Sequence, residues 1–124
     1  MSVFTLCVKD SFSAAHRLTD YHGKCEALHG HNFQVEAFVK GWQPENGGMV
    51  IDFTVLKGRL RQVLDVLDHK FINEISFFRE RAGSSEYIAM YVFHELRKLM
   101  TETTVSLAEV RVWESDTAWV AYGE

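Results

Sequence analysis

Two histidines separated by a single residue, His29 and His31, carry the clearest chemical signal in the sequence. Successive side chains of an extended strand alternate between its two faces, so both imidazoles point to the same side. At about 3.3 Å of rise per residue, roughly 6–7 Å separates their Cβ atoms, which lets two rings converge on one metal ion. Gly30 between them keeps the opposite face clear and allows a close backbone approach.

A third histidine, His16, ends an earlier alternating run, Phe12-Ser13-Ala14-Ala15-His16. If that run pairs beside the strand of His29 and His31, three neutral imidazoles meet at one point. Three histidines with an open fourth position are typical of a catalytic zinc site, whereas structural zinc sites are closed by four protein ligands. The competing interpretation is that these histidines lie at the edge of the core and bond to the backbone.

A cysteine, Cys25, precedes His29 by four residues and lies in a loop without periodicity over residues 17–28. A zinc ion and a histidine nearby would favour its thiolate, which is the reactive form of a cysteine. The alternative is a loop cysteine without a chemical role. The second cysteine, Cys7, falls inside a predicted strand, and we interpret it as a small apolar filler.

Two acidic positions complete the set of candidate site residues. Asp68 and His69 are adjacent and could form an imidazole base oriented by a carboxylate, although a histidine near a helix C-terminus also interacts favourably with the helix dipole. Glu114 continues the apolar parity of Val110 and Val112 to the end of a strand. It is either a solvated strand end or an acceptor for a ligand with adjacent N–H donors.

Length and composition favour one globular domain spanning residues 1–124, since 47% of the residues are hydrophobic. The net charge of -4 and the lack of a basic stripe argue against nucleic acid as a partner. The sequence has no long apolar run for a transmembrane helix and no signal-peptide pattern at its N-terminus. Two cysteines are too few for a disulfide scaffold, so we expect a cytoplasmic protein with reduced thiols.

Hydrophobic periodicity predicts the elements that position these residues. Alternation predicts strands over residues 3–16, with a break near Asp10, and over 31–41. Helical spacing from an N-cap at Asp52 includes Val55 in its apolar stripe and continues into residues 68–73, and residues 74–83 look irregular. A second helix begins at Ser84-Ser85-Glu86, and strands follow near 105–114 and 117–122. This order, strand-strand-helix-helix-strand-strand, predicts an α+β fold in which two helices cover one face of a four-stranded antiparallel sheet.

These residues together resemble the 6-pyruvoyl-tetrahydropterin synthase / 6-carboxytetrahydropterin synthase family over nearly the whole chain. The matching motifs occur in the family order: Phe12-Ser13-Ala14-Ala15-His16, Cys25-x-x-x-His29-Gly30-His31-Asn32, Gly48-Met49-Val50-Ile51-Asp52-Phe53, Leu67-Asp68-His69, Ser85-Glu86 and Val112-Trp113-Glu114. The short spacing from Cys25 to His29 is similar to that of the bacterial 6-carboxytetrahydropterin synthases of queuosine (7-deazaguanine) biosynthesis. The chain departs from the family pattern at Gly83-Ser84-Ser85-Glu86, where Pro-Thr-Ser/Ala-Glu is usual, and at Glu26 after the cysteine.

The resemblance implies a tunnelling fold that assembles into trimers and hexamers, with active sites between subunits. It implies Zn2+ on His16, His29 and His31. It also implies 7,8-dihydroneopterin triphosphate as the substrate, Cys25 as the proton-abstracting base tuned by the Asp68–His69 pair, and Glu114 as the anchor of the pterin ring. Three functions stay open: a 6-carboxytetrahydropterin synthase, a 6-pyruvoyl-tetrahydropterin synthase, and a non-catalytic metal- or pterin-binding paralogue.

Overall fold

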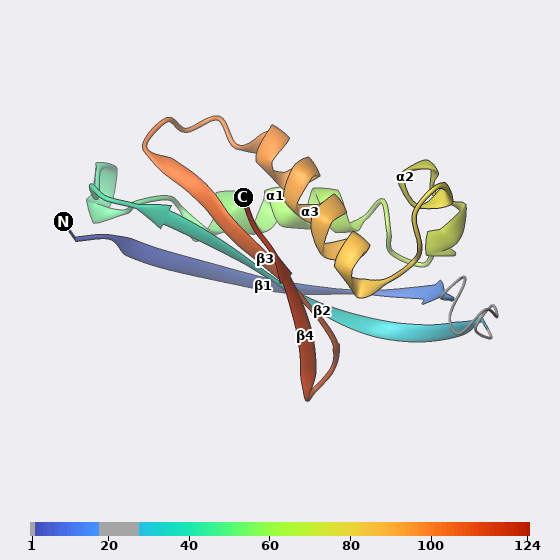
Figure 1. Cartoon of the computed structure of the whole chain (residues 1–124). Helices are drawn as coiled ribbons and strands as arrows, with labels where there is room; N and C mark the ends of the chain where they lie inside the picture. Colours follow the sequence, from blue (N-terminus) through green and yellow to red (C-terminus); the bar gives the residue numbers. More distant parts are fainter. Residues whose placement is uncertain (1, 18–27) are drawn as a thin grey trace.

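The chain folds into a long antiparallel sheet with its helices on one face (Figure 1). The computed structural model describes residues 2–17 and 28–124, and His29 by its backbone alone. Over these residues four strands pair in the order β1-β2-β3-β4, which confirms the predicted α+β fold. The described elements are β1 (Phe4–His16), β2 (His29–Gly41), η1 (Asn46–Gly48), α1 (Phe53–Leu64), η2 (Ile72–Glu74), α2 (Ser76–Arg79), α3 (Ser85–Leu99), β3 (Val105–Ser115) and β4 (Ala118–Tyr122).

Strands β1 and β2 form the long arm of the sheet, and alternation decides which of their faces is buried. In β2 the residues at positions 33, 35, 37 and 39 are fully buried, as the alternating pattern predicts. Phe12 of β1 lies opposite Phe33 of β2, and their rings stack with centroids 5.0 Å apart. The first strand is unbroken at Asp10, contrary to the expected interruption there, because Asp10 pairs in register with Val35.

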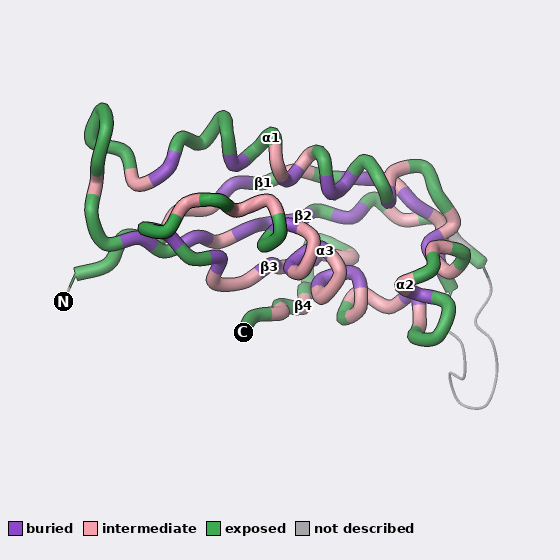
Figure 2. The backbone as a smooth tube through the Cα atoms, turned by 90° about the horizontal axis from the view of Figure 1, so that it is seen from above, coloured by how far each residue is buried: buried purple, intermediate pink, exposed green. Residues whose placement is uncertain are grey.

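Helices α1 and α3 lie over one face of this sheet and bury their apolar sides against it (Figure 2). Helix α1 begins where predicted, because the carboxylate of Asp52 accepts a hydrogen bond from the backbone N–H of Thr54 at 2.8 Å. Helix α3 begins at the predicted hydroxyl cap, where Ser84 accepts from the N–H of Tyr87. Among the described residues, the helices are all too short or too polar to span a membrane.

The structure corrects three expectations around α1. The helix ends at Leu64, followed by turns that stop at His69, whose positive φ of 59° redirects the chain into an extended segment. Val55 is 41% exposed, because the buried positions of α1 are residues 56, 60, 63 and 64. Residues 74–83, expected to be irregular, contain the short helix α2.

The first prediction separates the buried from the exposed side of α1. Leu60 is fully buried, so Leu60→Ala should lower the free energy of unfolding by about 2–5 kcal/mol through lost burial and a residual cavity. Val55→Ala on the same helix should change it by no more than about 0.5 kcal/mol. Urea unfolding followed by circular dichroism measures both. Equal losses would contradict the assigned helix face.

Candidate active site

Two of the predicted histidines meet at one end of the sheet because β1 and β2 pair in register. Ala14 lies opposite His31, and His16 lies opposite His29. The rings of His16 and His31 pack edge to face with centroids 4.9 Å apart. Only the backbone of His29 is described, so its role as a ligand stays a prediction that the register supports.

Glu114 joins the two histidines, which spacing alone did not predict. Its Oε1 lies 3.2 Å from Nε2 of His16 and 3.9 Å from Nε2 of His31. A β-bulge where Phe38 and Val39 of β2 meet β3 makes this possible, because it changes the parity of the buried residues along β3. Before the bulge, Leu107 faces the core; after it, Val110 and Val112 do, and Glu114 follows their parity.

The tautomer of His16 is set by the backbone of a distant loop. Its Nδ1 lies 2.7 Å from the carbonyl oxygen of Gly83, and a carbonyl oxygen only accepts, so Nδ1 carries the proton and donates. A neutral His16 therefore presents its Nε2 lone pair toward Glu114 and His31. Backbone carbonyls hold metal-binding histidines in this way in known sites. His16 is 1% exposed, so its ring is firmly packed.

These donors fit a divalent metal ion. The ligand atoms of His16, His31 and Glu114 all lie within 4.8 Å of one another. Ligands bound to one zinc at about 2.0–2.2 Å in a tetrahedral arrangement lie about 3.3–3.6 Å apart, close to the spacings of Glu114 from the two rings. A lone pair of His16 and a carboxylate oxygen that face each other at this distance also favour a shared cation. The described residues therefore contain a possible His-His-Glu metal site.

The Asp68–His69 pair lies across β1 from this cluster. Nδ1 of His69 is 3.1 Å from Oδ1 of Asp68, so the adjacent side chains are in contact. The same Asp68 oxygen accepts the backbone N–H of Ser13 at 3.0 Å. This hydrogen bond, helped by the charges of His69 and Arg61, holds the pKa of Asp68 below its usual value. Asp68 therefore contacts the Nδ1 side of the His69 ring and does not engage Nε2.

Arg61 holds the outer side of Asp68. Its guanidinium donates to Asp65 at 2.8 Å and to Asp10 at 3.0 Å, and it lies 3.8 Å from Oδ2 of Asp68. The arginine therefore links α1, β1 and the turn that carries His69. Local sequence signals did not reveal this residue, because its partners on β1 are about fifty positions away.

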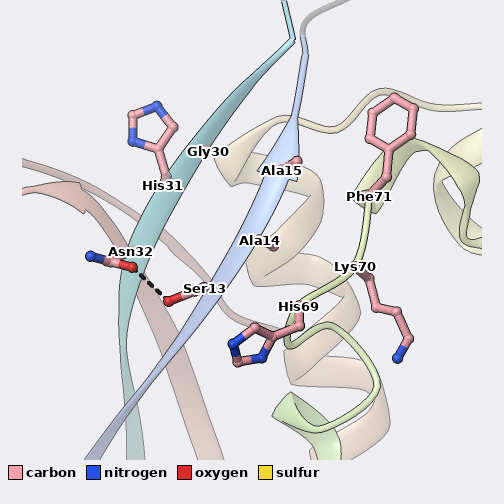
Figure 3. Close-up of a pocket in the computed structure, with 9 residues that line it drawn as sticks. All are labelled: Ser13, Ala14, Ala15, Gly30, His31, Asn32, His69, Lys70 and Phe71. Carbon is pink, nitrogen blue, oxygen red and sulfur yellow. Dashed lines mark hydrogen bonds between the residues drawn. The ribbon is translucent and has the colours of Figure 1, made fainter.

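One pocket of about 460 Å³ brings His31 and His69 together (Figure 3). Figure 3 shows residues 69–71 running beside β1, with β2 and His31 on the far side of that strand. The side chain of His69 is 82% exposed in the isolated chain. The pocket volume is in the range of small-molecule sites. The remaining lining residues are Ser13, Ala14, Ala15, Gly30, Asn32, Lys70 and Phe71.

A match to one protein family accompanies this geometry. Residues 5–124 match the profile of the family described as "6-pyruvoyl tetrahydropterin synthase". The chain belongs to this family. It is 37% identical to "6-carboxy-5,6,7,8-tetrahydropterin synthase" of Synechocystis sp. over 90% of this chain and 87% of the relative. It is 32% identical to "6-pyruvoyl tetrahydrobiopterin synthase" of Poecilia reticulata over 90% and 84%.

The fold of the family is also the fold of this chain. The structure of Caenorhabditis elegans 6-pyruvoyl tetrahydropterin synthase superposes with a TM-score of 0.86 at 28% identity, covering 100% of this chain and 97% of the relative. The tunnelling fold implied by the sequence resemblance is therefore confirmed. Relatives named as 6-carboxy and as 6-pyruvoyl synthases both match this chain, so the family is one of pterin-synthesising lyases.

Of the two cysteines in this member of the pterin synthase family, the structure describes only Cys7. Cys25 lies outside the described residues, and its role as the base stays a prediction. Cys7 is half-buried on the sheet face that the helices leave uncovered, with Sγ 3.9 Å from Oε2 of Glu36. Burial and the Glu36 carboxylate raise the pKa of the Cys7 thiol, which disfavours its thiolate. Cys7 therefore contacts a carboxylate rather than filling the apolar core as expected.

A smaller pocket of about 150 Å³ adds two residues that the sequence indicated only as part of a helix start. Ser85 and Glu86, at the start of α3, line it together with Glu114 and Trp119. Two carboxylates, those of Glu86 and Glu114, therefore line one pocket together with residues of β4. The family motif Ser85-Glu86 was the available signal for these positions, although neither periodicity nor charge pattern linked them to Glu114.

The second prediction uses the lowered pKa of Asp68. Because the folded-state pKa lies below the unfolded value, ionised Asp68 stabilises the fold above the unfolded pKa of about 3.9, and this stability is lost as pH falls through the folded pKa. The stability advantage of the wild type over Asp68→Asn should therefore be full near neutral pH and shrink in acid. Urea titrations between neutral and acid pH measure it. An advantage that is constant with pH would refute the assigned ionised contact.

Proposed function

We propose that this chain is a zinc-dependent lyase that converts 7,8-dihydroneopterin triphosphate and one water molecule to 6-carboxy-5,6,7,8-tetrahydropterin, acetaldehyde and triphosphate. The observation that carries the proposal is the cluster of His16, His31 and Glu114 beside a pocket that His69 also lines, in a chain of the pterin synthase family. The short spacing from Cys25 to His29 favours the 6-carboxy product and a place in queuosine biosynthesis.

In this proposal His16, His29 and His31 hold the zinc ion. Bound there, zinc supplies Lewis acidity and a template for the side-chain hydroxyls of the substrate. The chain keeps this part of the site rigid, because His16 is buried and its ring is fixed by the Gly83 carbonyl. The donor set is mainly imidazole, which suits zinc better than magnesium or calcium.

The proton chemistry belongs to a separate group of residues. Cys25 would remove the C–H proton next to the ring on the side chain of the substrate. A thiol whose pKa lies near neutral pH suits that step. His69, oriented by Asp68, would exchange the proton with Cys25. The large exposure of His69 supports an arrangement in which it serves Cys25 of a neighbouring subunit in a trimer or hexamer.

Glu114 is proposed as the anchor of the pterin ring. An ionised carboxylate accepts two parallel N–H bonds from a guanidine-like ring edge, and Glu86 lies in the same small pocket to support it. Glu114 lies 3.2 Å from His16, so a ring bound to it would lie beside the proposed metal position and the substrate side chain would reach the zinc. The same proximity offers Glu114 a competing role as a metal ligand, which a variant can separate from the first.

The third prediction tests the reaction itself. Zinc-loaded protein incubated with 7,8-dihydroneopterin triphosphate should yield acetaldehyde and a carboxypterin, identified by mass spectrometry. A pyruvoyl product would instead establish the alternative 6-pyruvoyl-tetrahydropterin synthase. Unchanged substrate with bound zinc would favour a non-catalytic pterin- or metal-binding protein.

Cys25→Ala tests the proposed base in this assay, and Cys7→Ala is its matched control. It removes the proposed base and none of the proposed metal ligands, so zinc content should stay at the wild-type level while turnover falls by at least about 100-fold, the lower range for a general base. Cys7→Ala removes the other thiol and should leave turnover unchanged. Equal activity of Cys25→Ala and the wild type would take Cys25 out of the mechanism.

The fourth prediction separates the two roles of Glu114. Glu114→Gln keeps the shape of the side chain and loses its charge. If the residue anchors the ring, KM should rise about 10- to 100-fold, the loss of a hydrogen bond to a charged group, with zinc content unchanged. Metal analysis and steady-state kinetics on one preparation provide both values. Loss of zinc with an unchanged KM for the remaining loaded protein would make Glu114 a ligand instead.

A further inference from the structure

The segment 69–73, which begins with the proposed proton-transfer histidine, lies along the outer edge of β1. The N–H of His69 donates to the carbonyl of Ser13 at 2.6 Å, and the N–H of Ala15 donates to the carbonyl of Lys70 at 2.9 Å. Ala15 and Phe71 form a parallel bridge. These bonds use alternate residues of β1, as a short added strand would.

The side chain of Asn73 continues this row of hydrogen bonds to the β1 edge beyond the point where the backbone of the segment stops forming them. At Ile72 the segment turns into the short helix η2, so its own peptide groups no longer face β1. The Asn73 amide takes their place: its Oδ1 accepts the N–H of Arg17 at 3.0 Å, and its Nδ2 donates to the carbonyl of Arg17 at 3.0 Å. Both backbone groups of Arg17, the residue after His16, are thus held by one side chain.

The other side of Asn73 packs against Gly83, whose carbonyl holds His16. A Cβ added at Gly83 would lie 2.6 Å from Oδ1 of Asn73, so a larger residue at position 83 would force the Asn73 amide to shift. The carbonyl of Gly83 accepts Nδ1–H of His16 at 2.7 Å. The peptide bond after His16 and the back of its ring are therefore fixed through the same pair of residues, Asn73 and Gly83.

We infer that Asn73 and Gly83 form a clamp that positions His16 as a metal ligand. The inference rests on the proposed function for the identity of the metal and goes beyond it, because neither residue touches the metal position. Asn73 fixes where β1 ends, and Gly83 fixes the tautomer and direction of the ring.

A purely structural role for Asn73 would give a different result. An asparagine that merely holds a loop contributes to unfolding free energy and leaves metal affinity alone. A positioning residue changes metal affinity, and second partners of metal-binding histidines typically contribute 10- to 100-fold. The readout is therefore zinc affinity measured without substrate, by competition with a chromophoric chelator.

The fifth prediction compares three single variants near the clamp and one double variant. Asn73→Ala and Gly83→Ala should each weaken zinc binding about 10- to 100-fold, and both should alter the visible spectrum of the cobalt-substituted protein, because the His16 ring moves. Ser84→Ala is the matched control: it removes the N-cap of α3 next to Gly83 and should lower Tm while zinc affinity stays within about twofold. The double variant Asn73→Ala/Gly83→Ala should lose less than the sum, since removing the amide relieves the clash at Gly83.

The outcomes distinguish this inference from the lyase proposal. Zinc affinity at the wild-type level in Asn73→Ala and Gly83→Ala, whatever their Tm, overturns the clamp. Weakened zinc binding in both variants supports it even if the wild type turns over no pterin. Asn73→Asp provides a second variant if Asn73→Ala does not fold: it keeps the acceptor for the Arg17 N–H and sets an oxygen against the Arg17 carbonyl, so zinc affinity should again fall. A wild type that binds no zinc overturns both the clamp and the metal-dependent lyase.

Discussion

The register between β1 and β2 is the constraint on which the cluster of His16, His31 and Glu114 depends. A slip of one residue would turn every side chain of one strand to the opposite face. It would separate His16 from His31, which now lie on the same side of the sheet with ring centroids 4.9 Å apart. It would also expose Phe33 and Val35, both fully buried, each worth about 1.5–3 kcal/mol of burial. The core that holds the strands in register therefore also holds the ligands together.

The parts of this arrangement that follow from local chemistry could be predicted from the sequence. Alternation in residues 31–41 predicted which face of β2 is buried, and Asp52 and Ser84 predicted where the two long helices begin. The same parity argument placed His29 and His31 on one face of a strand and set Glu114 apart as a carboxylate at the end of an apolar face. Each of these inferences depends on residues only a few positions apart.

The parts that could not be predicted arise from contacts between distant residues. The bulge opposite Phe38 depends on the pairing of two strands, and it decides that Glu114 faces the histidines. The left-handed conformation of His69 could not be predicted, because glycine, the residue that usually indicates it, is absent from this position. The hydrogen bond between Asp68 and Ser13, which are distant in the sequence, stabilises this conformation. Val55 was wrongly predicted to face the core, because three- and four-residue spacing fits two neighbouring faces of the helix equally well. Packing against the sheet decides which of the two faces is buried.

The two halves of the site differ in rigidity for a physical reason. The proposed metal-binding half needs fixed geometry, and His16 is buried, packed against Phe33 with ring centroids 5.2 Å apart, and bonded to a backbone carbonyl. The proposed proton-transfer half needs access, and His69 lines an open pocket, with Asp68 beside its ring and Arg61 near Asp68. A zinc ion tolerates little displacement of its ligands, whereas a proton carrier must approach its partner. Segment 69–73 joins the halves, because its hydrogen bonds to β1 begin at His69 and end next to His16, so the exposed His69 and the buried His16 are positioned by the same strand.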